Sequence, residues 1–371
     1  MRILCLSRAP LDYLGGIPAY CLNLYSGGEF DVINYSYDLS KKIKTKNKRL
    51  VKGIKEIVFP SQIIIGTFAI SIEYILSIVF NKSDYDYVHI QHPDPISALC
   101  LIFYKLRKPN LKIVVSWHAD IYKSYKLFSP IIFLIDFFLY IISAKLIFFT
   151  PFHLRNSFIY KFKFLNKKTK IIHNCIEIKD FNFYKKNKRK IIKNKKKINI
   201  LSIGRLVKYK GYEYAIKALK YTDENVYYTI VGNGPLKSSL LDIVNNLNLN
   251  NRVKLIGEVT EKKKYKLLAE ADIFLFPSIT TSEAYGLVQL EAMAHNIPII
   301  NTLLENGVNY LAPTNIAITC KKMNIDEIYK GIMELINNEK KYIKLSENSY
   351  HHIKKFDIFE MRKEFINSLK N

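Results

Sequence analysis

Two glutamates, Glu283 and Glu291, are spaced in a way that helix patterning does not explain. The segment around them, Ala269–Ile300, is typical of an apolar strand, a Pro-Ser break, a polar loop and a helix that begins near Gly286. Glu283 would lie just outside the helix N-terminus, where backbone N–H groups favour an anion, and Glu291 about a turn and a half inside. This arrangement suits a ligand with phosphates at the N–H groups and sugar hydroxyls at the carboxylates, which is a nucleotide sugar.

A glycine and two cations follow another predicted strand. Gly204, Arg205 and Lys210 come after the apolar run Ile198–Ile203. Cations beside a glycine at a strand–helix junction can clamp a diphosphate, because arginine bridges two oxygens and lysine acts as a point charge. Surface solvation would explain Lys210 and its neighbour Lys208 equally well.

Other candidates also follow predicted strands. Gly15 and Gly16 precede a helical stretch, where a backbone can approach a phosphate, although a tight turn would explain them too. His118 could hydrogen-bond a sugar hydroxyl, or it could be a satisfied core histidine. Asp120 is a nearby acceptor-side candidate. A flat nucleobase could lie against the backbone at Val259.

Length and charge indicate two domains and an acidic partner. The chain has 371 residues and a net charge of +25, which is enough length for two cores. Residues 1–178 carry 24 basic and 12 acidic side chains, residues 179–197 carry 10 and 1, and residues 198–371 carry 23 and 19. The excess indicates a negatively charged surface or ligand near the first half, or a genome biased towards lysine, asparagine and isoleucine.

The cysteines and the long apolar stretches indicate in which cellular compartment the protein would lie. The 5 cysteines are scattered without metal-ligand spacing, as expected in a reducing cytoplasm. The N-terminal apolar run is too short for a signal peptide. The stretches Ile57–Phe80 and Leu127–Phe149 approach membrane-spanning length, but they contain Glu73 and Asp136, which are costly in lipid. They fit helix-plus-strand elements, or contact with a headgroup layer.

Alternating short strands and helix-length segments predict parallel α/β layers. We expect one Rossmann-like domain over residues 1–178, a basic linker over 179–197, a second such domain over 198–349, and a C-terminal helix over 350–371 that packs back on the first domain. Two doubly wound domains facing a central cleft would bind a ligand beyond the carboxyl ends of their strands. The expected strands are Ile3–Leu6, Val88–Ile90, Ile113–Ser116, Leu146–Phe149, Ile171–Ile172, Ile198–Ile203, Val226–Val231, Val253–Ile256, Ile273–Phe276 and Pro298–Ile300, with helices over Tyr212–Leu219 and Leu236–Leu247.

These motifs together resemble the retaining glycosyltransferases of family 4, which have the GT-B fold. The resemblance covers nearly the whole chain and is strongest in the second half: GRLVKYKG, VGNGPL, GEV followed by LAEADIFLFPS, and the pair Glu283 and Glu291. The stretches HPDPISALCLIFYKLRK and VVSWHADIYKSY are similar to the members that build bacterial O-antigen and other cell-surface polysaccharides.

The resemblance implies a role for each matching residue. Arg205 and Lys210 would hold the diphosphate, while Glu291 would bind the ribose hydroxyls and Glu283 would contact the donor sugar. The other implied positions are Gly16 near the phosphates, His118 near the sugar, and the backbone of Gly286, Leu287 and Val288 beside the donor. Val259 stays a donor-binding candidate, and Asp120 is a local hypothesis with less family support.

Three positions depart from the family pattern. Cys175 follows Asn174 where a glycine is usual, His295 and Asn296 replace a pair of a small residue and glycine, and the chain around Asn315 is shortened and lacks a glycine. We expect these changes to affect the local backbone and to leave the ligand contacts intact.

The expected activity is retaining transfer of a hexose from a nucleotide sugar to a glycan acceptor, lipid-linked through polyprenyl diphosphate. This would occur at the inner face of the cytoplasmic membrane, with the protein held peripherally on an anionic surface. No aspartate-rich metal motif is present, so we expect no metal or other cofactor, with the two cations stabilising the leaving diphosphate instead.

Three other readings stay open. A nucleotide-sugar epimerase can share this fold. A degenerate, non-catalytic nucleotide-sugar binder would also fit the departures. A basic nucleic-acid binder would need a recognition motif of aromatic and basic residues, and none is present, so no nucleic-acid partner is expected.

Overall fold

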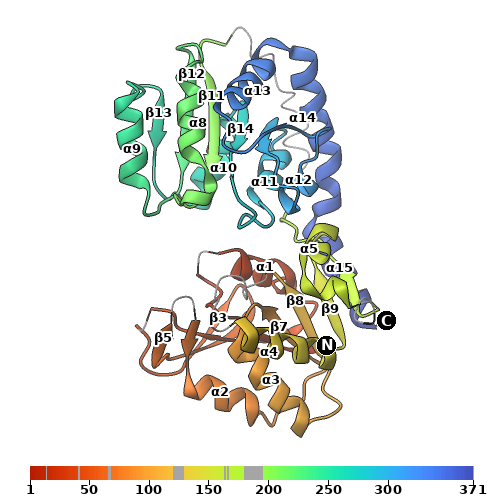
Figure 1. Cartoon of the computed structure of the whole chain (residues 1–371). Coiled ribbons are helices and arrows are strands. Elements are labelled where there is room, and N and C mark those ends of the chain that lie inside the picture. Colours follow the sequence, from red (N-terminus) through yellow and green to blue (C-terminus); the bar gives the residue numbers. More distant parts are fainter. Residues whose placement is uncertain are drawn as a thin grey trace. The chain divides into compact units, whose positions relative to one another are not determined.

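The chain forms two compact units in the computed structural model, which describes residues 1–13, 15–40, 42–65, 68–119, 129–162, 164, 167–178 and 195–370. Unit 1 comprises Met1–Cys175 and Ile358–Asn371, and unit 2 comprises Ile176–Asp357 (Figure 1). Residues 179–194 of the expected basic linker lie outside the described residues.

Unit 1 is built on a sheet of 8 strands in the order β10-β9-β8-β7-β1-β2-β4-β3. Neighbouring strands run parallel, except that β3 is antiparallel to β4 at the edge. A separate antiparallel hairpin joins β5 and β6. The strands are β1 (Arg2–Leu6), β2 (Asp31–Tyr37), β3 (Asn47–Val51), β4 (Ile54–Phe59), β5 (Ile63–Ile65), β6 (Phe68–Ile70), β7 (Tyr87–His92), β8 (Ile113–Trp117), β9 (Lys145–Phe148) and β10 (Thr169–Ile171).

Helices cover both faces of this sheet. Right-handed crossovers place α3 and α4 on one face, and α2 packs against α3 there, while α1 and α15 pack together on the other (Figure 1). The helices are α1 (Gly16–Tyr25), α2 (Ile72–Val79), α3 (Pro95–Arg107), α4 (Ser129–Ile142), α5 (Pro151–Asn156), the short 3₁₀ helix η1 (Phe158–Lys161) and α15 (Ile358–Lys370).

The core of unit 1 lies between the sheet and the inner sides of α2, α3 and α4. Tyr74, Leu101 and Leu139, one from each helix, are fully buried with Ile90 of β7. Each large apolar side chain removed from water contributes about 1.5–3 kcal/mol, so this contact fixes the helices on the sheet.

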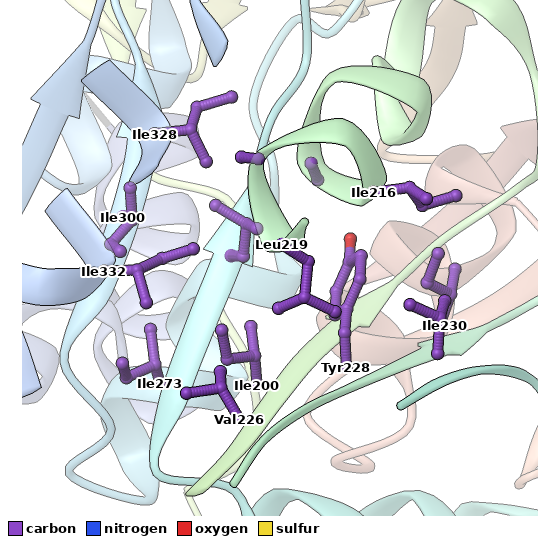
Figure 2. Close-up of a cluster of buried hydrophobic side chains, with 14 of the residues drawn as sticks. Ile200, Ile216, Leu219, Val226, Tyr228, Ile230, Ile273, Ile300, Ile328 and Ile332 are labelled. Carbon is purple, nitrogen blue, oxygen red and sulfur yellow. The ribbon is translucent and has the colours of Figure 1, made fainter. Parts of the chain in front are cut away.

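Unit 2 is built on a parallel sheet of 6 strands in the order β13-β12-β11-β14-β15-β16. Figure 2 shows its core, where Ile200, Val226 and Ile273 from three strands meet Leu219 and Ile332 from two helices. Its strands are β11 (Ile198–Ile203), β12 (Val226–Val231), β13 (Val253–Leu255), β14 (Ile273–Phe276), β15 (Ile299–Thr302) and β16 (Ala317–Cys320), and its helices are η2 (Lys208–Lys210), α8 (Tyr212–Leu219), α9 (Lys237–Asn246), α10 (Glu261–Glu270), α11 (Val288–Ala294), α12 (Gly307–Leu311), α13 (Ile325–Asn337), α14 (Glu339–Ile353) and η3 (Lys354–Phe356).

The strand order of unit 2 creates a switch point. From β11 the chain adds β12 and β13 on one side and then β14, β15 and β16 on the other. In such sheets a ligand binds beyond the carboxyl ends of the strands, where the order reverses. The switch point here is the loop region after β11 and β14.

The C-terminal helix differs from the predicted span of 350–371. The helix α14 continues to Ile353 inside unit 2, the chain turns through η3, and α15 begins only at Ile358 in unit 1. Residues after the turn contact unit 1 directly, because the Tyr87 hydroxyl donates a hydrogen bond to the Leu369 carbonyl over 2.5 Å.

The two long apolar stretches form separate strands and helices, as predicted. Ile57–Phe80 contributes to β4, the hairpin and α2, and the described part of Leu127–Phe149 forms α4 and β9. None of the described helices combines the length and apolar character needed to cross a bilayer.

Candidate functional site

The loop after β11 packs against the loop after β14 at the switch point of unit 2. Gly211 separates η2 from α8 with a φ of +66°, and a Cβ there would overlap the carbonyl oxygen of Pro277. Only glycine adopts this backbone and this close approach without strain. The contact brings Lys210, the last residue of η2, next to the loop that carries Glu283.

Lys210 and Glu283 form a buried ion pair. Their side chains are each 11% exposed, and the Lys210 ammonium contacts a Glu283 carboxylate oxygen directly. The Ser278 hydroxyl donates to the same carboxylate over 3.3 Å, and the Asn306 amide donates to the Glu283 carbonyl over 2.7 Å. The ammonium also lies 5.0 Å from the ring centre of Phe276. These partners offset the cost of removing two charges from water.

Gly204 makes room for the lysine, and Arg205 lies exposed beside it. A Cβ on Gly204 would lie 3.2 Å from the Lys210 ammonium and 2.8 Å from the Tyr212 hydroxyl. Gly232, after β12, must also be glycine, because a Cβ there would overlap the Gly204 carbonyl oxygen. The exposed guanidinium of Arg205 therefore begins a loop that is fixed by close backbone packing.

Glu291 presents one paired and one unpaired oxygen. Its Oε1 accepts from the Lys264 ammonium over 3.0 Å, and its buried Oε2 has no hydrogen-bond partner among the described residues. Burial raises the pKa of Glu291, and the Lys264 charge opposes that shift. A buried acceptor without a partner is unusual, and a ligand hydroxyl would supply the missing donor.

Val259 precedes α10, the helix that supplies the partner of Glu291. It lies in the turn after β13, immediately before Thr260, whose side chain caps α10 by accepting from the Lys263 backbone N–H over 3.4 Å. That helix supplies Lys264, the partner of Glu291. The structure thus connects the expected nucleobase position with the expected ribose position through α10.

Gly286 shapes the start of α11. Its φ is +79°, and a Cβ would come within 3.1 Å of the Phe276 ring. Leu287 and Val288 follow as half-buried residues at the first turn of the helix. In this turn the N–H groups of Gln289 and Leu290 donate to the carbonyls of Gly286 and Leu287 over 2.9 Å each.

The departure at His295 and Asn296 fits the local backbone. Asn296 has a φ of +55° at the end of α11, a conformation that asparagine tolerates better than most residues. The Ile297 N–H donates to the Ala292 carbonyl over 3.1 Å and the Asn296 N–H to Met293 over 2.9 Å, which closes the helix with a Schellman motif. Asparagine therefore replaces the usual glycine without losing the cap.

His118 lies at the carboxyl end of β8 in unit 1. Its Nε2 donates to the Gln91 side-chain oxygen over 2.9 Å, and its ring centre lies 4.8 Å from that of Phe149. Burial lowers the pKa of His118 well below its usual 6.5, and the electrostatic interaction with nearby His89 lowers it further. The imidazole is therefore neutral at pH 7, with its Nδ1 as the remaining acceptor.

The other predicted positions in unit 1 are less informative. Gly16 is exposed at the first turn of α1, and the space that a Cβ would fill is open. Asp120 lies outside the described residues. Gly16 follows β1 and His118 follows β8, so both lie at the carboxyl edge of the unit 1 sheet.

Sequence reasoning missed two residues that hold the candidate site together. Lys264 stands in a lysine-rich helix, where nothing in the sequence marks it as the partner of Glu291. Gln91 is inside a buried strand and orients His118. In the described ranges no group of three or more His, Cys, Asp and Glu side chains could hold a metal ion.

Comparison with known proteins finds a family likeness over the second half of the chain. Residues 183–352 match the family model described as Glycosyl transferases group 1. An uncharacterized glycosyltransferase of Haemophilus influenzae is 34% identical over 170 residues, which are 44% of this chain and 46% of that protein. The O-antigen biosynthesis glycosyltransferase WclY of Escherichia coli is 30% identical over 228 residues, 59% of this chain and 61% of that protein. The match therefore spans about half the length of these curated relatives.

Solved structures extend the likeness to the full length. Anabaena Alr3699/HepE in complex with UDP superposes with a TM-score of 0.78 at 18% identity and covers 100% of both chains. The same protein with UDP-glucose gives 0.75 at 18% identity, over 100% of this chain and 99% of the other. This likeness shows the fold, and it confirms the predicted pair of Rossmann-like sheets. The chain thus has the GT-B fold, and its residues 183–352 are similar to the group 1 glycosyltransferases.

Proposed function

We propose that this protein is a retaining glycosyltransferase that moves a hexose from a nucleoside-diphosphate sugar to a glycan acceptor. One observation carries the proposal: the segments that follow the neighbouring strands β11 and β14 bring the candidate residues to the switch point of unit 2. These residues are Arg205, the buried ion pair of Lys210 and Glu283, and Glu291, which has one carboxylate oxygen without a hydrogen-bond partner among the described residues. The complexes of Alr3699/HepE with UDP and UDP-glucose support a donor of this class.

The main catalytic requirement is to stabilise the negative charge that develops on the leaving diphosphate. Breaking the bond between the sugar and the diphosphate leaves negative charge on the phosphate oxygens, so preorganised cations lower the barrier. Lys210 is already held in place by Glu283, and Arg205 is exposed to meet the phosphates. These two cations would do the work that a divalent metal does in other transferases.

The carboxylates would position the donor. The free Oε2 of Glu291 would accept a ribose hydroxyl while Lys264 holds the other oxygen. Glu283 would contact the sugar beside the Lys210 ammonium. Retention follows from the family resemblance, by front-face attack in which the leaving phosphate takes the acceptor proton.

His118 would act as a neutral hydrogen-bonding group. Its low pKa excludes a permanent positive charge at pH 7. Its Nδ1 would accept a hydrogen bond from a sugar hydroxyl, while the bond to Gln91 fixes the ring. We assign it to orienting the reacting sugar.

The acceptor would be a lipid-linked glycan in cell-surface polysaccharide synthesis, with the protein at the inner face of the cytoplasmic membrane. The likeness to the O-antigen glycosyltransferase WclY supports this assignment. The basic excess of residues 1–178 suits a diphosphate-linked acceptor and an anionic membrane.

A thermal-shift panel of UDP-, GDP- and dTDP-sugars, with and without EDTA, tests the donor site first. A ligand at 100 times its Kd stabilises the folded protein by about 2.7 kcal/mol, so one base should raise the melting temperature with or without the chelator. Transfer to a polyprenyl-diphosphate-linked acceptor is then followed by NMR, which should show the donor's anomeric configuration retained. Stabilisation by none of the nucleotides, or release of an epimerised free sugar, would contradict the proposal.

A further inference from the structure

The outer face of α4 is apolar throughout. Its five large exposed side chains are all hydrophobic, with exposed fractions from 36% to 61%. They are Ile131, Phe133, Leu134, Phe138 and Ile141. A helix on the surface of a globular protein normally carries charged and polar residues on its outer side, so this helix is unusual.

The single acidic residue of α4 points inward. Asp136 is 1% exposed, and its Oδ2 lies 3.1 Å from Nε2 of His92, which is fully buried. The helix thus places its carboxylate in the interior, while apolar side chains such as Leu134 and Phe138 are about half exposed. Burial of the outer apolar side chains against a partner would remove the cost of exposing them to water.

The apolar surface continues across the two neighbouring helices. The helix α3 packs against both α4 and α2, and its outer side presents Leu99, Phe103 and Leu106. The helix α2 adds Ile72 and Leu76, and Phe80 follows at its end. Eleven exposed hydrophobic side chains on three adjacent helices therefore form one surface, which we call the α2–α3–α4 face.

Cations border this face at the carboxyl ends of the three helices. Arg107 donates to the Val79 carbonyl at the end of α2 over 2.5 Å. Lys105 donates to the Leu111 carbonyl over 2.5 Å, and Lys168 donates to the Ile141 carbonyl at the end of α4 over 2.7 Å. These hydrogen bonds go to neutral carbonyls, and within the described part of the chain no carboxylate forms an ion pair with the three cations.

The cations at the border of this face repel one another, and a bound anion would reduce that repulsion. Burial lowers the pKa of Lys168, and the positive charge of Lys105 lowers it further. Lys82 is exposed nearby, and Lys108 pairs with Asp84 over 2.9 Å. An apolar surface with a cationic border is complementary to a bilayer with anionic headgroups, since the apolar side chains enter the acyl boundary while the cations meet phosphates.

We propose that the α2–α3–α4 face docks unit 1 on an anionic lipid surface, with the three helices lying in the plane of the membrane interface. This extends the proposed function, whose lipid-linked acceptor lies at a membrane. It rests, however, on unit 1 alone and not on the donor site.

Vesicle flotation of the full chain tests the docking surface. The probes are phosphatidylcholine vesicles with and without phosphatidylglycerol, at low and high salt. Wild-type protein should float with the anionic vesicles and bind the neutral ones more weakly. Removing three apolar anchors by Phe103→Gln, Leu134→Gln and Phe138→Gln should lower anionic-vesicle binding by at least about tenfold.

A matched control keeps the number and type of changes but moves them to unit 2. Tyr221→Gln, Leu241→Gln and Met323→Gln replace exposed apolar side chains there and should leave vesicle binding unchanged. Lys82→Gln should lower binding to anionic vesicles by about fivefold, the effect expected of one lysine near such a surface, and should weaken the salt dependence. Circular dichroism confirms that each variant is folded.

Several outcomes would overturn the proposal. These are absence of wild-type flotation, equal flotation of the apolar variant, and an equal loss in the unit 2 control. Analytical ultracentrifugation covers the remaining alternative: if the apolar variant converts a dimer to a monomer without losing vesicle binding, the face is a protein interface.

The test separates this inference from the proposed function. The apolar variant should keep the thermal shift with its nucleotide sugar, and Arg205→Ala should float like wild type. If wild-type protein fails to float but shows the thermal shift, only the membrane surface is refuted. If it floats but no nucleotide sugar shifts its melting temperature, only the donor site is refuted.

Discussion

The buried pair of Lys210 and Glu283 shows how single residues prepare the candidate site. The two charges are held together by burial and by hydrogen bonds before any ligand arrives. Arg205 differs, because it is exposed, and in the proposed function it contributes only when phosphate is bound. The two cations are therefore expected to respond differently to substitution.

Arg205→Ala should reduce activity without reducing stability. Losing one preorganised charge-stabilising group costs about 2–4 kcal/mol of barrier, so kcat/KM should fall about 30- to 1000-fold. Steady-state kinetics with the cognate donor measure the loss. Lys208→Ala, an exposed lysine in the same loop, is the matched control and should stay near wild type; near-normal turnover of Arg205→Ala would exclude the assigned role.

Lys210→Ala should lower stability as well as activity. The substitution leaves Glu283 buried without its cation, and breaking a buried pair by removing one partner costs about 3–5 kcal/mol. Chemical denaturation, followed by circular dichroism for unit 2, should show an earlier transition than in Arg205→Ala. Equal stability of the two variants would mean that the ion pair contributes nothing to the fold.

The buried histidines of unit 1 predict a pH dependence of stability. Burial lowers the pKa of His89 to about 3, so the folded state does not take up the proton that the unfolded state binds below about pH 6.5. The free energy of unfolding should therefore fall as the pH drops from about 6.5 to 5, by about 1.4 kcal/mol per pH unit for this residue.

Urea denaturation at several pH values measures that slope. Trp117 is the single tryptophan of the chain and is buried in unit 1, so its fluorescence reports this unit. His89→Gln should flatten the slope. Parallel slopes for the variant and wild type would show that His89 does not cause the pH dependence.

At the scale of elements, the loops of unit 2 depend on glycine for two different reasons. Gly232 and Gly257 pair with each other in an isolated bridge, and both have positive φ. A Cβ on Gly232 would overlap the Gly204 carbonyl, while the space around Gly257 is open. The first position needs glycine for packing and conformation, and the second for conformation alone.

Gly232→Ala should therefore destabilise unit 2 more than Gly257→Ala. The cost of the unfavourable backbone, about 1–3 kcal/mol, is common to both, and only Gly232→Ala must also move the loop before Arg205. Differential scanning calorimetry gives the stability, and nucleotide-sugar binding should weaken only in Gly232→Ala. Equal effects on both measurements would contradict the close backbone packing.

At the scale of the whole molecule, the end of the chain completes the first unit. The fully buried ring of Phe365 from α15 packs 6.2 Å from Tyr25 and 5.8 Å from Phe30, centre to centre. Arg362 of the same helix donates to the Asn23 carbonyl over 2.9 Å. Residues from both ends of the sequence therefore share one core.

Phe365→Ala should destabilise unit 1 by about 3–5 kcal/mol, the usual cost of removing a buried phenylalanine. Trp117 fluorescence during denaturation should show the earlier transition, while unit 2 should melt as before. Phe359→Ala on the same helix is the control, because that ring is 64% exposed. A larger loss of stability from Phe359→Ala than from Phe365→Ala would mean that the opposite side of α15 packs against the sheet.

The sequence alone predicted the apolar strands well because each has a local signal. Ile198–Ile203, Val226–Val231 and Ile273–Phe276 were predicted with the bounds that the structure shows. The strand β2 was missed because its polar residues point inward. Asn34 and Ser36 donate to Glu56 over 2.9 and 3.0 Å, and that partner lies on another strand, where no local pattern reveals it.

The sequence by itself determined the residue types of the candidate site, the fold class and the glycines that the loops require. These follow from local patterns and from spacing along the chain. Only the tertiary structure decided that Lys264 is the partner of Glu291 and that Gln91 orients His118. It also decided that Asp136 of α4 points inward while Leu134 and Phe138 are exposed. Partner choice and exposure depend on residues distant in sequence, so they arise only when the sheets form and bring those residues together.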